Sequence, residues 1–500
     1  MRSDPVWESI MDYLGVDHKQ ADLSEDLLSA YSLIIVNAET TRGEQKTLIK
    51  YVKSGGAILE MFGHEFYYAE RISTKFKRQI YDQSEDTDLK LIPFLDFYSS
   101  VHVHKDQEYF EGLIHFKTKG KGSVGFAGFD LPSLISDLNF KRKRFISDRL
   151  PFPDELVSKV SKGYLLLLFR ILLQKLHFLR DLPFLFKHYS RNSKPYFAFR
   201  IDTDFGDKDS INALLNLSRE SGVPFTWFLH VKAHEEWLEV FKKDPQQELA
   251  LHSYVHATSD DLKKIDRDLN KAQEILRRYK IDFKGFAAPY GILNNAVKKA
   301  LERLPVNYSS EFSYLYDALP MYQAEMKRWQ IPIHPICTGS MSRLRYSLDD
   351  MKVYFLNQIR EHQSDQTPLI LYHHPMQKGF EVWDEILKSA IIDDFNPITM
   401  EGLRAWYNHR STSSFSAVVE NDSIRIECDP QEDLCFNISR EIKKFDLLKF
   451  KERTVSTNVS SSFKLKTPYT PPDLDIKKNR RTDINLIKTG IIDSRNRKYL

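Results

Sequence analysis

Between residues 195 and 410 the sequence alternates short apolar stretches with longer stretches of helical periodicity. The segments "PYFAFRID" at 195–202, "VPFTWFLH" at 223–230 and "PLILYHHP" at 368–375 are strand-like, whereas "DDLKKIDRDLNKAQEILRRYK" at 260–280 has the spacing of an amphipathic helix. Repeated strand-then-helix order is typical of a parallel sheet, because each helix returns the chain to the start of the next strand. The number of such units predicts an α/β sheet that is closed or nearly closed.

The N-terminal segment, residues 1–150, contains a second α/β pattern. Residues 30–63 predict a strand, a helix and a strand, and residues 112–134 predict two strands joined by a glycine-lysine turn. The pattern resembles the glutamine-amidotransferase-like (flavodoxin-like) domains found in some carbohydrate enzymes. Amidotransferase chemistry needs a thiolate, and no cysteine precedes Cys337. This domain is therefore expected to be non-catalytic.

Two other regions flank the central one. Residues 151–194 are expected to form a helical linker, whose apolar run at 163–180 is interrupted by charge before it reaches the ~20 residues of a membrane span. Residues 411–500 are expected to form a small β-rich module and a tail. No signal-peptide pattern is apparent. We therefore expect no integral membrane span, and a cytoplasmic location is favoured.

The charge balance limits the class of partner. The formal net charge is +3 at pH 7 in a chain of 500 residues. So small an excess of basic residues argues against nucleic acid as a partner. A neutral or mixed-charge substrate is expected instead.

Two histidine pairs have the H-x-x-x-H spacing, His230 with His234 and His252 with His256. The spacing alone carries little information, because 16 histidines in 500 residues give about half such a pair by chance. Only the second pair follows an acidic strand end, "RIDTDFG" at 200–206, and precedes a Pro-Tyr-Gly turn. We therefore expect a metal site at His252 and His256, and no role in it for His230 or His234.

The acidic strand end carries Arg200, Asp202 and Asp204. Alternate residues of a strand point to the same face, so these side chains are expected to lie together. Strand ends of parallel sheets are also where α/β folds build their sites. The alternative interpretation is a solvated acidic cluster that opens the helix expected at 209–221.

These motifs, in this order over about 195–410, resemble those of the polysaccharide deacetylases, or NodB-like carbohydrate esterases. The aspartate motif has one inserted residue, "HSYVH" at 252–256 matches H-[ST]-x-x-H, and "LILYHHP" at 369–375 resembles the last motif. "AAPYG" at 287–291 matches R-x-P-Y-G, with Ala287 in place of the arginine. The resemblance implies a distorted (β/α)7 barrel of NodB type.

The resemblance also implies an Asp-His-His site for zinc or another divalent transition metal, with Asp204, His252 and His256 as ligands. Asp202 is then expected to be the general base. Because the family's aspartates are adjacent and these are not, the two aspartates could exchange roles.

Three further roles follow from the same resemblance. His374 is expected to protonate the leaving group, with His373 as the alternative, unless both histidines are buried structural residues of the barrel. A backbone N–H near Tyr290 is expected to stabilise the oxyanion. The arginine that supports the base in this family is absent at Ala287, and Arg200 is the candidate to replace it because it shares a strand face with the acid two residues later.

The sequence therefore predicts a metal-dependent hydrolase that removes acetyl groups from an N-acetylated sugar or polysaccharide. Two alternatives remain open at this point. One is a non-catalytic carbohydrate-binding protein that has kept the fold and lost the arginine. The other is an amidohydrolase that acts on another small C–N substrate.

Overall fold

The structure is a computed structural model. It describes residues 4–20, 23, 30–81, 88–106, 109–389, 391–420, 423–429, 433–442, 444–449, 454–458 and 482–500. The chain folds into two units that interleave in the sequence. Unit 1 comprises 1–137, 159–188 and 414–464, and unit 2 comprises 138–158, 189–413 and 465–500.

Unit 2 is built on one large sheet. Its strands follow the order β15-β16-β14-β13-β12-β11-β10-β17, and β18 also pairs with β10. In chain order they are β10 (Tyr196–Asp202), β11 (Phe225–Leu229), β12 (Glu248–Leu251), β13 (Gly285–Phe286), β14 (Tyr308–Ser309), β15 (Met321–Gln323), β16 (Arg328–Gln330), β17 (Leu369–His373) and β18 (Asn396–Pro397). All pairings are parallel except that of β15 with β16.

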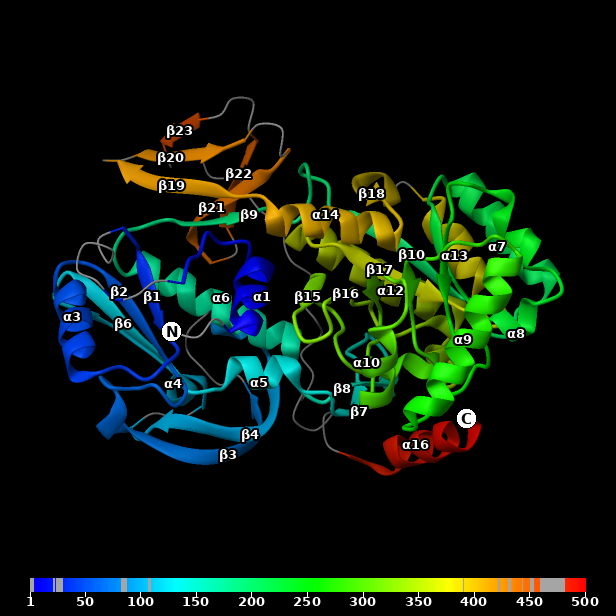
Figure 1. The fold of residues 1–500 in the computed structure, drawn as a ribbon, viewed down its shortest axis with the longest axis horizontal. Helices are drawn as coiled ribbons and strands as arrows, with labels where there is room; N and C mark the ends of the chain where they lie inside the picture. The colour runs from blue at the N-terminus through cyan, green and yellow to red at the C-terminus, as the bar shows by residue number, and fades with distance from the viewer. Residues whose placement is uncertain are drawn as a thin grey trace. The chain divides into compact units, whose positions relative to one another are not determined.

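The strand-then-helix alternation predicted from the sequence is present in unit 2 (Figure 1). The expectation was a closed or nearly closed sheet, and the described strands β15 and β17 at its two ends do not pair with each other. Instead, the irregular segment after β16 contacts β17, where the His334 N–H donates to the Ile370 carbonyl over 2.9 Å. A complete (β/α)7 barrel therefore stays a prediction.

The helices of unit 2 begin and end where local chemistry dictates. The main ones are α7 (Lys208–Ser221), α9 (Leu262–Arg278), α10 (Asn295–Leu301), α12 (Leu348–Asp365), α13 (Phe380–Leu387), α14 (Met400–Thr412) and α16 (Ile484–Asn496). The Asp207 side chain caps the first turn of α7 by accepting from the Ser210 N–H, and Gly222 ends the helix in the left-handed conformation. α9 buries Ile265, Leu269 and Ile275, which is the apolar spacing that predicts one buried face.

Unit 1 contains the strand-helix-strand pattern expected at residues 30–63. β1 (Leu33–Val36) and β2 (Ala57–Met61) are parallel and are connected through α3 (Arg42–Lys53). The sheet continues with β6 (Gly122–Ala127) and ends with β5 (Ile114–Lys119), the two strands predicted around the glycine-lysine turn. β3 (Ile72–Tyr81) and β4 (Phe94–His104) form a separate hairpin.

The segment expected to be a helical linker, 151–194, is more than a connection. It contains β8 (Asp154–Ser158) and β9 (Phe184–Lys187) as well as the helix α6 (Lys162–Phe178). The helix packs on unit 1, since the Ser123 hydroxyl donates to the Leu176 carbonyl over 3.1 Å. The segment departs from the expectation because both α6 and β9 bury apolar side chains.

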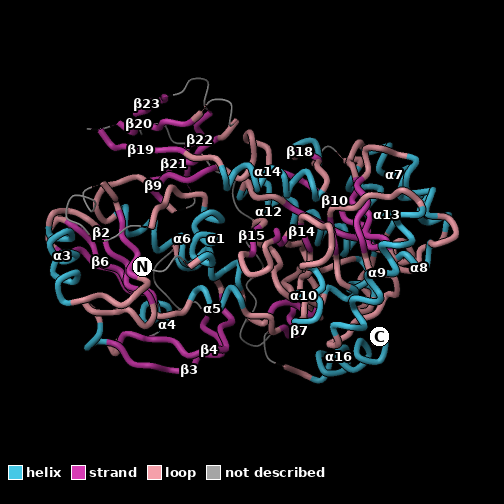
Figure 2. The backbone as a smooth tube through the Cα atoms, in the orientation of Figure 1, coloured by secondary structure: helices cyan, strands magenta, loops and turns pink. Residues whose placement is uncertain are grey.

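The described residues of the segment 414–458 form strands that belong to unit 1 (Figure 2). β19 (Phe415–Glu420), β20 (Ser423–Cys428) and β23 (Thr454–Asn458) form one sheet, whereas β21 (Cys435–Glu441) joins β22 (Lys444–Lys449) to β9. This agrees with the β-rich pattern read from the sequence. No helix in the described part of the chain has the length and apolar character needed to cross a bilayer.

Candidate active site

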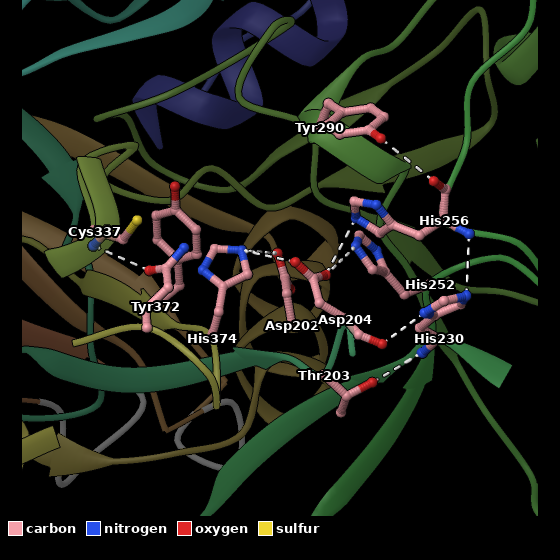
Figure 3. Close-up of polar contacts among 12 residues, drawn as sticks. Asp202, Thr203, Asp204, His230, His252, His256, Tyr290, Cys337, Tyr372 and His374 are labelled. Atoms are coloured by element: carbon pink, nitrogen blue, oxygen red, sulfur yellow. Dashed lines mark hydrogen bonds and ion pairs between the residues drawn. The ribbon is translucent and has the colours of Figure 1, made fainter. Parts of the chain in front are cut away.

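The candidate site lies at the carboxyl ends of β17, β10, β11 and β12, which are neighbours in the parallel sheet. Parallel pairing aligns Asp202 with Phe228 and Ile201 with His373. The residues that follow these strand ends are therefore brought to one edge although they are far apart in the sequence. Figure 3 shows the two aspartates between His374 on one side and the His252/His256 pair on the other.

The residue inserted into the aspartate motif, Thr203, has a structural role. Its N–H and its hydroxyl both donate to the Phe228 carbonyl, at 3.0 and 3.1 Å. The hydroxyl in turn accepts from the His230 N–H at 2.9 Å. Thr203 thus attaches the end of β10 to β11, and the chain turns immediately afterwards. Asp202 ends the strand, whereas Asp204 projects from the turn.

Three non-glycine residues of the site have a left-handed backbone. The φ angles are +40° for Asp204, +66° for Ser253 and +60° for Tyr290. Such conformations cost about 1 kcal/mol or more each and persist where the surroundings enforce them. Each of the three stands in one of the predicted motifs, so the strain is concentrated where the side chains must be aimed.

Asp204, His252 and His256 bring one oxygen and two nitrogens within 4.8 Å of one another. Asp204 Oδ1 lies 3.4 Å from His252 Nε2 and 3.2 Å from His256 Nε2. His252 Nδ1 donates to the Ala287 carbonyl over 2.7 Å, so in the neutral ring Nε2 carries a lone pair. A lone pair that faces a carboxylate oxygen is unfavourable unless a proton or a metal cation lies between them.

The donor set therefore fits a divalent transition metal. Two imidazoles and one carboxylate, with further coordination positions left open, form a common ligand set of hydrolytic zinc sites. Asp204 Oδ1 is also buried without a hydrogen-bond partner among the described residues. Burial alone would raise the pKa of the Asp204 carboxyl, but the charges of His374 and His256 hold it well below its usual value. Asp204 is thus ionised and available as a ligand.

Arg200 and Asp202 form a buried two-point ion pair. Arg200 Nε donates to Asp202 Oδ1 over 2.6 Å, and Arg200 Nη2 donates to Oδ2 over 2.8 Å. Arg200 Nη1 donates to the carbonyl and hydroxyl of Ser310, at 2.8 and 3.0 Å. The arginine is fully buried, and Ala287 contributes only backbone contacts to the site. Arg200 therefore has the position expected of a replacement for the missing arginine.

This ion pair determines the charge of Asp202. Burial would raise the pKa of the Asp202 carboxyl, but the charges of Arg200 and His252 outweigh burial and lower it. The carboxylate is consequently ionised at neutral pH. His374 Nε2 lies 3.9 Å from Asp202 and 3.7 Å from Asp204.

The two strand-end histidines point to opposite faces of β17. Burial lowers the pKa of His374, but Asp204 and Cys337 raise it to about 10, so the ring is protonated as an acid must be. His373 is completely buried, contacts the Thr338 hydroxyl at 3.2 Å, and has its pKa lowered to about 3 by burial. The structure thus brings His374 to the aspartates and leaves His373 in the core.

His230 lies at the site although the sequence reasoning gave it no role there. Its Nδ1 donates to the Asp204 carbonyl over 2.6 Å, and its Nε2 accepts from the His256 N–H over 3.1 Å. The ring bridges two of the three candidate ligands and is held neutral, because burial lowers its pKa to about 3. The sequence did hold one sign of this role: His230 directly follows β11, the strand that pairs with β10, at whose end the aspartates lie. His234 packs instead against the Trp237 ring.

Aromatic rings flank the candidate ligand His256. The Tyr290 ring centroid lies 4.7 Å from that of His256, and the Phe205 ring centroid lies 5.9 Å from it. The Tyr290 hydroxyl also contacts the His256 carbonyl at 3.4 Å. The site thus combines an Asp-His-His group, an ionised carboxylate held by arginine, a protonated histidine and an aromatic rim.

This combination on a parallel sheet defines a candidate hydrolase site, and residues 194–309 match the family model of the polysaccharide deacetylases. The chain therefore contains a polysaccharide deacetylase domain. The matched segment includes both aspartates and both ligand histidines and ends before His374. No curated protein sequence matches the chain.

Several solved structures are similar to part of the chain. A Mycobacterium smegmatis protein named as a polysaccharide deacetylase is 16% identical over 46% of this chain and 96% of its own, with a TM-score of 0.39. The peptidoglycan deacetylase PdaC of Bacillus subtilis is 16% identical over 43% of this chain and 92% of its own, with a TM-score of 0.31. A pseudoenzyme of the carbohydrate esterase 4 (CE4) family from Bacillus anthracis is 17% identical over 42% of this chain and 66% of its own, with a TM-score of 0.32.

Proposed function

We propose that this protein is a metal-dependent hydrolase that removes acetyl groups from an N-acetylated sugar or polysaccharide. The observation that carries the proposal is the contact between Arg200 and Asp202 beside the Asp-His-His group. It supplies the cation that the motif lacks at Ala287, and with it an ionised base. The aromatic rim of Phe205 and Tyr290 suits a sugar ring, whose C–H groups pack on aromatic faces.

The proton transfers are assigned to this chain's own residues. A divalent ion such as zinc, held by Asp204, His252 and His256, supplies Lewis acidity that lowers the pKa of water at the site. Asp202, ionised and fixed by two hydrogen bonds, accepts the proton of the attacking water. Because both its oxygens are held by Arg200, the carboxylate cannot rotate away from this position.

The departing amine needs a proton, and His374 is the assigned donor. Its raised pKa keeps the ring protonated at neutral pH, and its Nε2 lies on the aspartate side of the site. Negative charge that develops on the carbonyl oxygen is assigned to the backbone N–H of Tyr290, which the left-handed turn of the Pro-Tyr-Gly segment orients. His230 is assigned a positioning role, because it fixes Asp204 and His256 relative to one another.

The test is acetate release by purified protein loaded with one divalent ion. We expect acetate from an N-acetylglucosamine oligomer with zinc or cobalt, and none after chelation. The matched control is His256→Ala, which removes a ligand without changing the base. Acetate release that survives both chelation and His256→Ala would overturn the metal assignment.

The same assay separates the two alternatives. A protein that binds metal and the oligomer with no acetate released would be a carbohydrate-binding protein of deacetylase fold. Release of ammonia or a carboxylate from small amides, with no action on N-acetylated sugars, would indicate an amidohydrolase. Both outcomes are distinguishable from misfolding because metal content is measured in parallel.

A further inference from the structure

Residues 497–500 lie beside the second ligand histidine. The Thr258 N–H donates to the Lys498 carbonyl over 3.0 Å, and the Leu500 N–H donates to the Thr258 carbonyl over 3.0 Å. Thr258 also forms a parallel bridge with Tyr499. Because Thr258 is two residues after His256, this short pairing places the segment next to the candidate metal group.

The helix that precedes this segment is attached to the rest of unit 2 by ion pairs. In α16 (Figure 1), Asp493 accepts from Arg142 and, over 2.6 Å, from Arg343, while Asp483 just before the helix pairs with Arg144. The side chain of Arg142 is 9% exposed and that of Asp493 is 15% exposed. Partly buried pairs of this kind hold a segment better than exposed ones. Residues 497–500 are therefore fixed at both of their ends.

Two cations of this segment lie over the aromatic rim. The Arg497 guanidinium is 5.7 Å from the Tyr290 ring centroid, and Lys498 Nζ is 4.9 Å from the Phe205 ring centroid. The Lys498 N–H also donates to the Tyr290 hydroxyl over 2.9 Å. Both rings contact His256, as described above, so the two cations stand at the entrance to the metal group. Phe205 as a residue is 55% exposed, which keeps this side open to a ligand.

The charges of Arg497 and Lys498 are not compensated by an ion pair in the described part of the chain. Within the described residues, no carboxylate lies within ion-pairing distance of Arg497 or Lys498. The acid beside this rim is Asp204, which directly precedes Phe205 and belongs to the candidate metal group. Although the net charge of the whole chain is small, positive charge is concentrated at this rim. This local charge can attract a ligand of opposite charge.

We propose that residues 497–500 form one wall of the substrate entrance, and that Arg497 and Lys498 select an N-acetylated glycan that carries carboxylate groups. The inference deepens the proposed function and rests on it. The sugar that bears the acetamide contacts the aromatic rim, and a neighbouring acidic sugar meets the two cations. The proposal replaces the expectation of a neutral or mixed-charge substrate with that of an acidic one.

The test compares two charge-matched variants of the full chain. Arg497→Gln/Lys498→Gln removes the two rim cations, whereas Lys488→Gln/Arg495→Gln removes two exposed cations of α16 that contact no residue of the site. Binding is measured by calorimetry with two probes, an alternating N-acetylglucosamine–glucuronate tetrasaccharide and an N-acetylglucosamine tetramer. Acetate release from both probes is measured in parallel.

We expect wild-type protein to bind the acidic tetrasaccharide more tightly, with a preference that weakens as salt is added. The rim variant should lose about tenfold in affinity for the acidic probe and less than about twofold for the neutral one. The control variant should match wild type. Equal weakening of both probes, tighter binding of both, or no preference in wild type would each overturn the inference.

The readouts keep this inference separate from the proposed function. Charge-selective binding without acetate release from either probe would support the wall and refute the deacetylase. Acetate release without charge selectivity would support the deacetylase and refute the wall.

Discussion

Replacing Arg200 with glutamine tests the feature on which the proposed chemistry depends most. The variant removes the guanidinium that grips both oxygens of Asp202 and leaves a buried carboxylate without its cation. Breaking a buried pair by removing one partner destabilises a protein by about 3–5 kcal/mol. Once the arginine is gone, burial is the dominant influence, so the pKa of Asp202 should rise instead of being held low.

The kinetic consequence has a definite sign. In the wild type the pKa of Asp202 is lowered, so the ionised base is present throughout the neutral range and is lost only in acid. In Arg200→Gln the acidic limb of the pH profile should move upward. Acetate release near pH 7 should fall about 10²-fold, with partial recovery as the pH is raised. Metal content should stay at the wild-type level, because none of the three ligands is changed.

The assay is acetate release across pH, with metal content and melting temperature measured on the same samples. Arg200→Lys keeps a positive charge but loses the pair of hydrogen bonds to the two oxygens of Asp202. Its pH profile should lie between those of the wild type and Arg200→Gln. Arg410→Gln is the matched control, since Arg410 is also fully buried but lies in α14; it should change stability and leave the pH profile unmoved. An Arg200→Gln protein with an unmoved acidic limb and activity within threefold of wild type would refute the reasoning.

Four other outcomes are expected. His252→Ala should lose the metal because its Nε2 faces Asp204, and elemental analysis that still finds one ion per chain would contradict this. Alanine at His374 should lower acetate release about 10²-fold with metal retained, whereas alanine at His373 should mainly lower the melting temperature; the reverse ranking would exchange their roles. Burial raises the pKa of Glu60 from 4.5 to about 7, so the contribution of Glu60 to the free energy of unfolding is full below pH 4.5 and is lost as the pH rises through 7. Between pH 5 and pH 8 the melting temperature of Glu60→Gln should therefore fall less than that of the wild type. Equal falls in the two proteins would refute this assignment. Glutamine incubated with the full chain should yield no glutamate, since residues 1–150 contain no thiol; glutamate release would contradict the non-catalytic interpretation.

The sequence alone determined the local parts of this protein. The strand-then-helix alternation of 195–410, the strand-helix-strand of 30–63 and the hairpin near the glycine-lysine turn all follow from hydrophobic periodicity and turn residues, and the structure contains them. The choice of the His252/His256 pair followed from its order relative to the acidic strand end. The strands, helices and turns depend on neighbours in the chain, which is why they could be predicted, whereas the assignment of the histidine pair to a metal stays a prediction.

The tertiary structure decided which side chains face the site. Adjacent residues of a strand point to opposite faces, so the sequence favoured His374 but kept His373 as an alternative, and only the neighbours of β17 showed which of the two rings lies beside the aspartates. The bridge made by His230 and the wall made by residues 497–500 depend on contacts between segments that are distant in the chain, 26 residues apart for His230 and Asp204 and 208 for Tyr290 and Lys498. Such contacts are selected by the packing of the whole unit, and no local pattern records them.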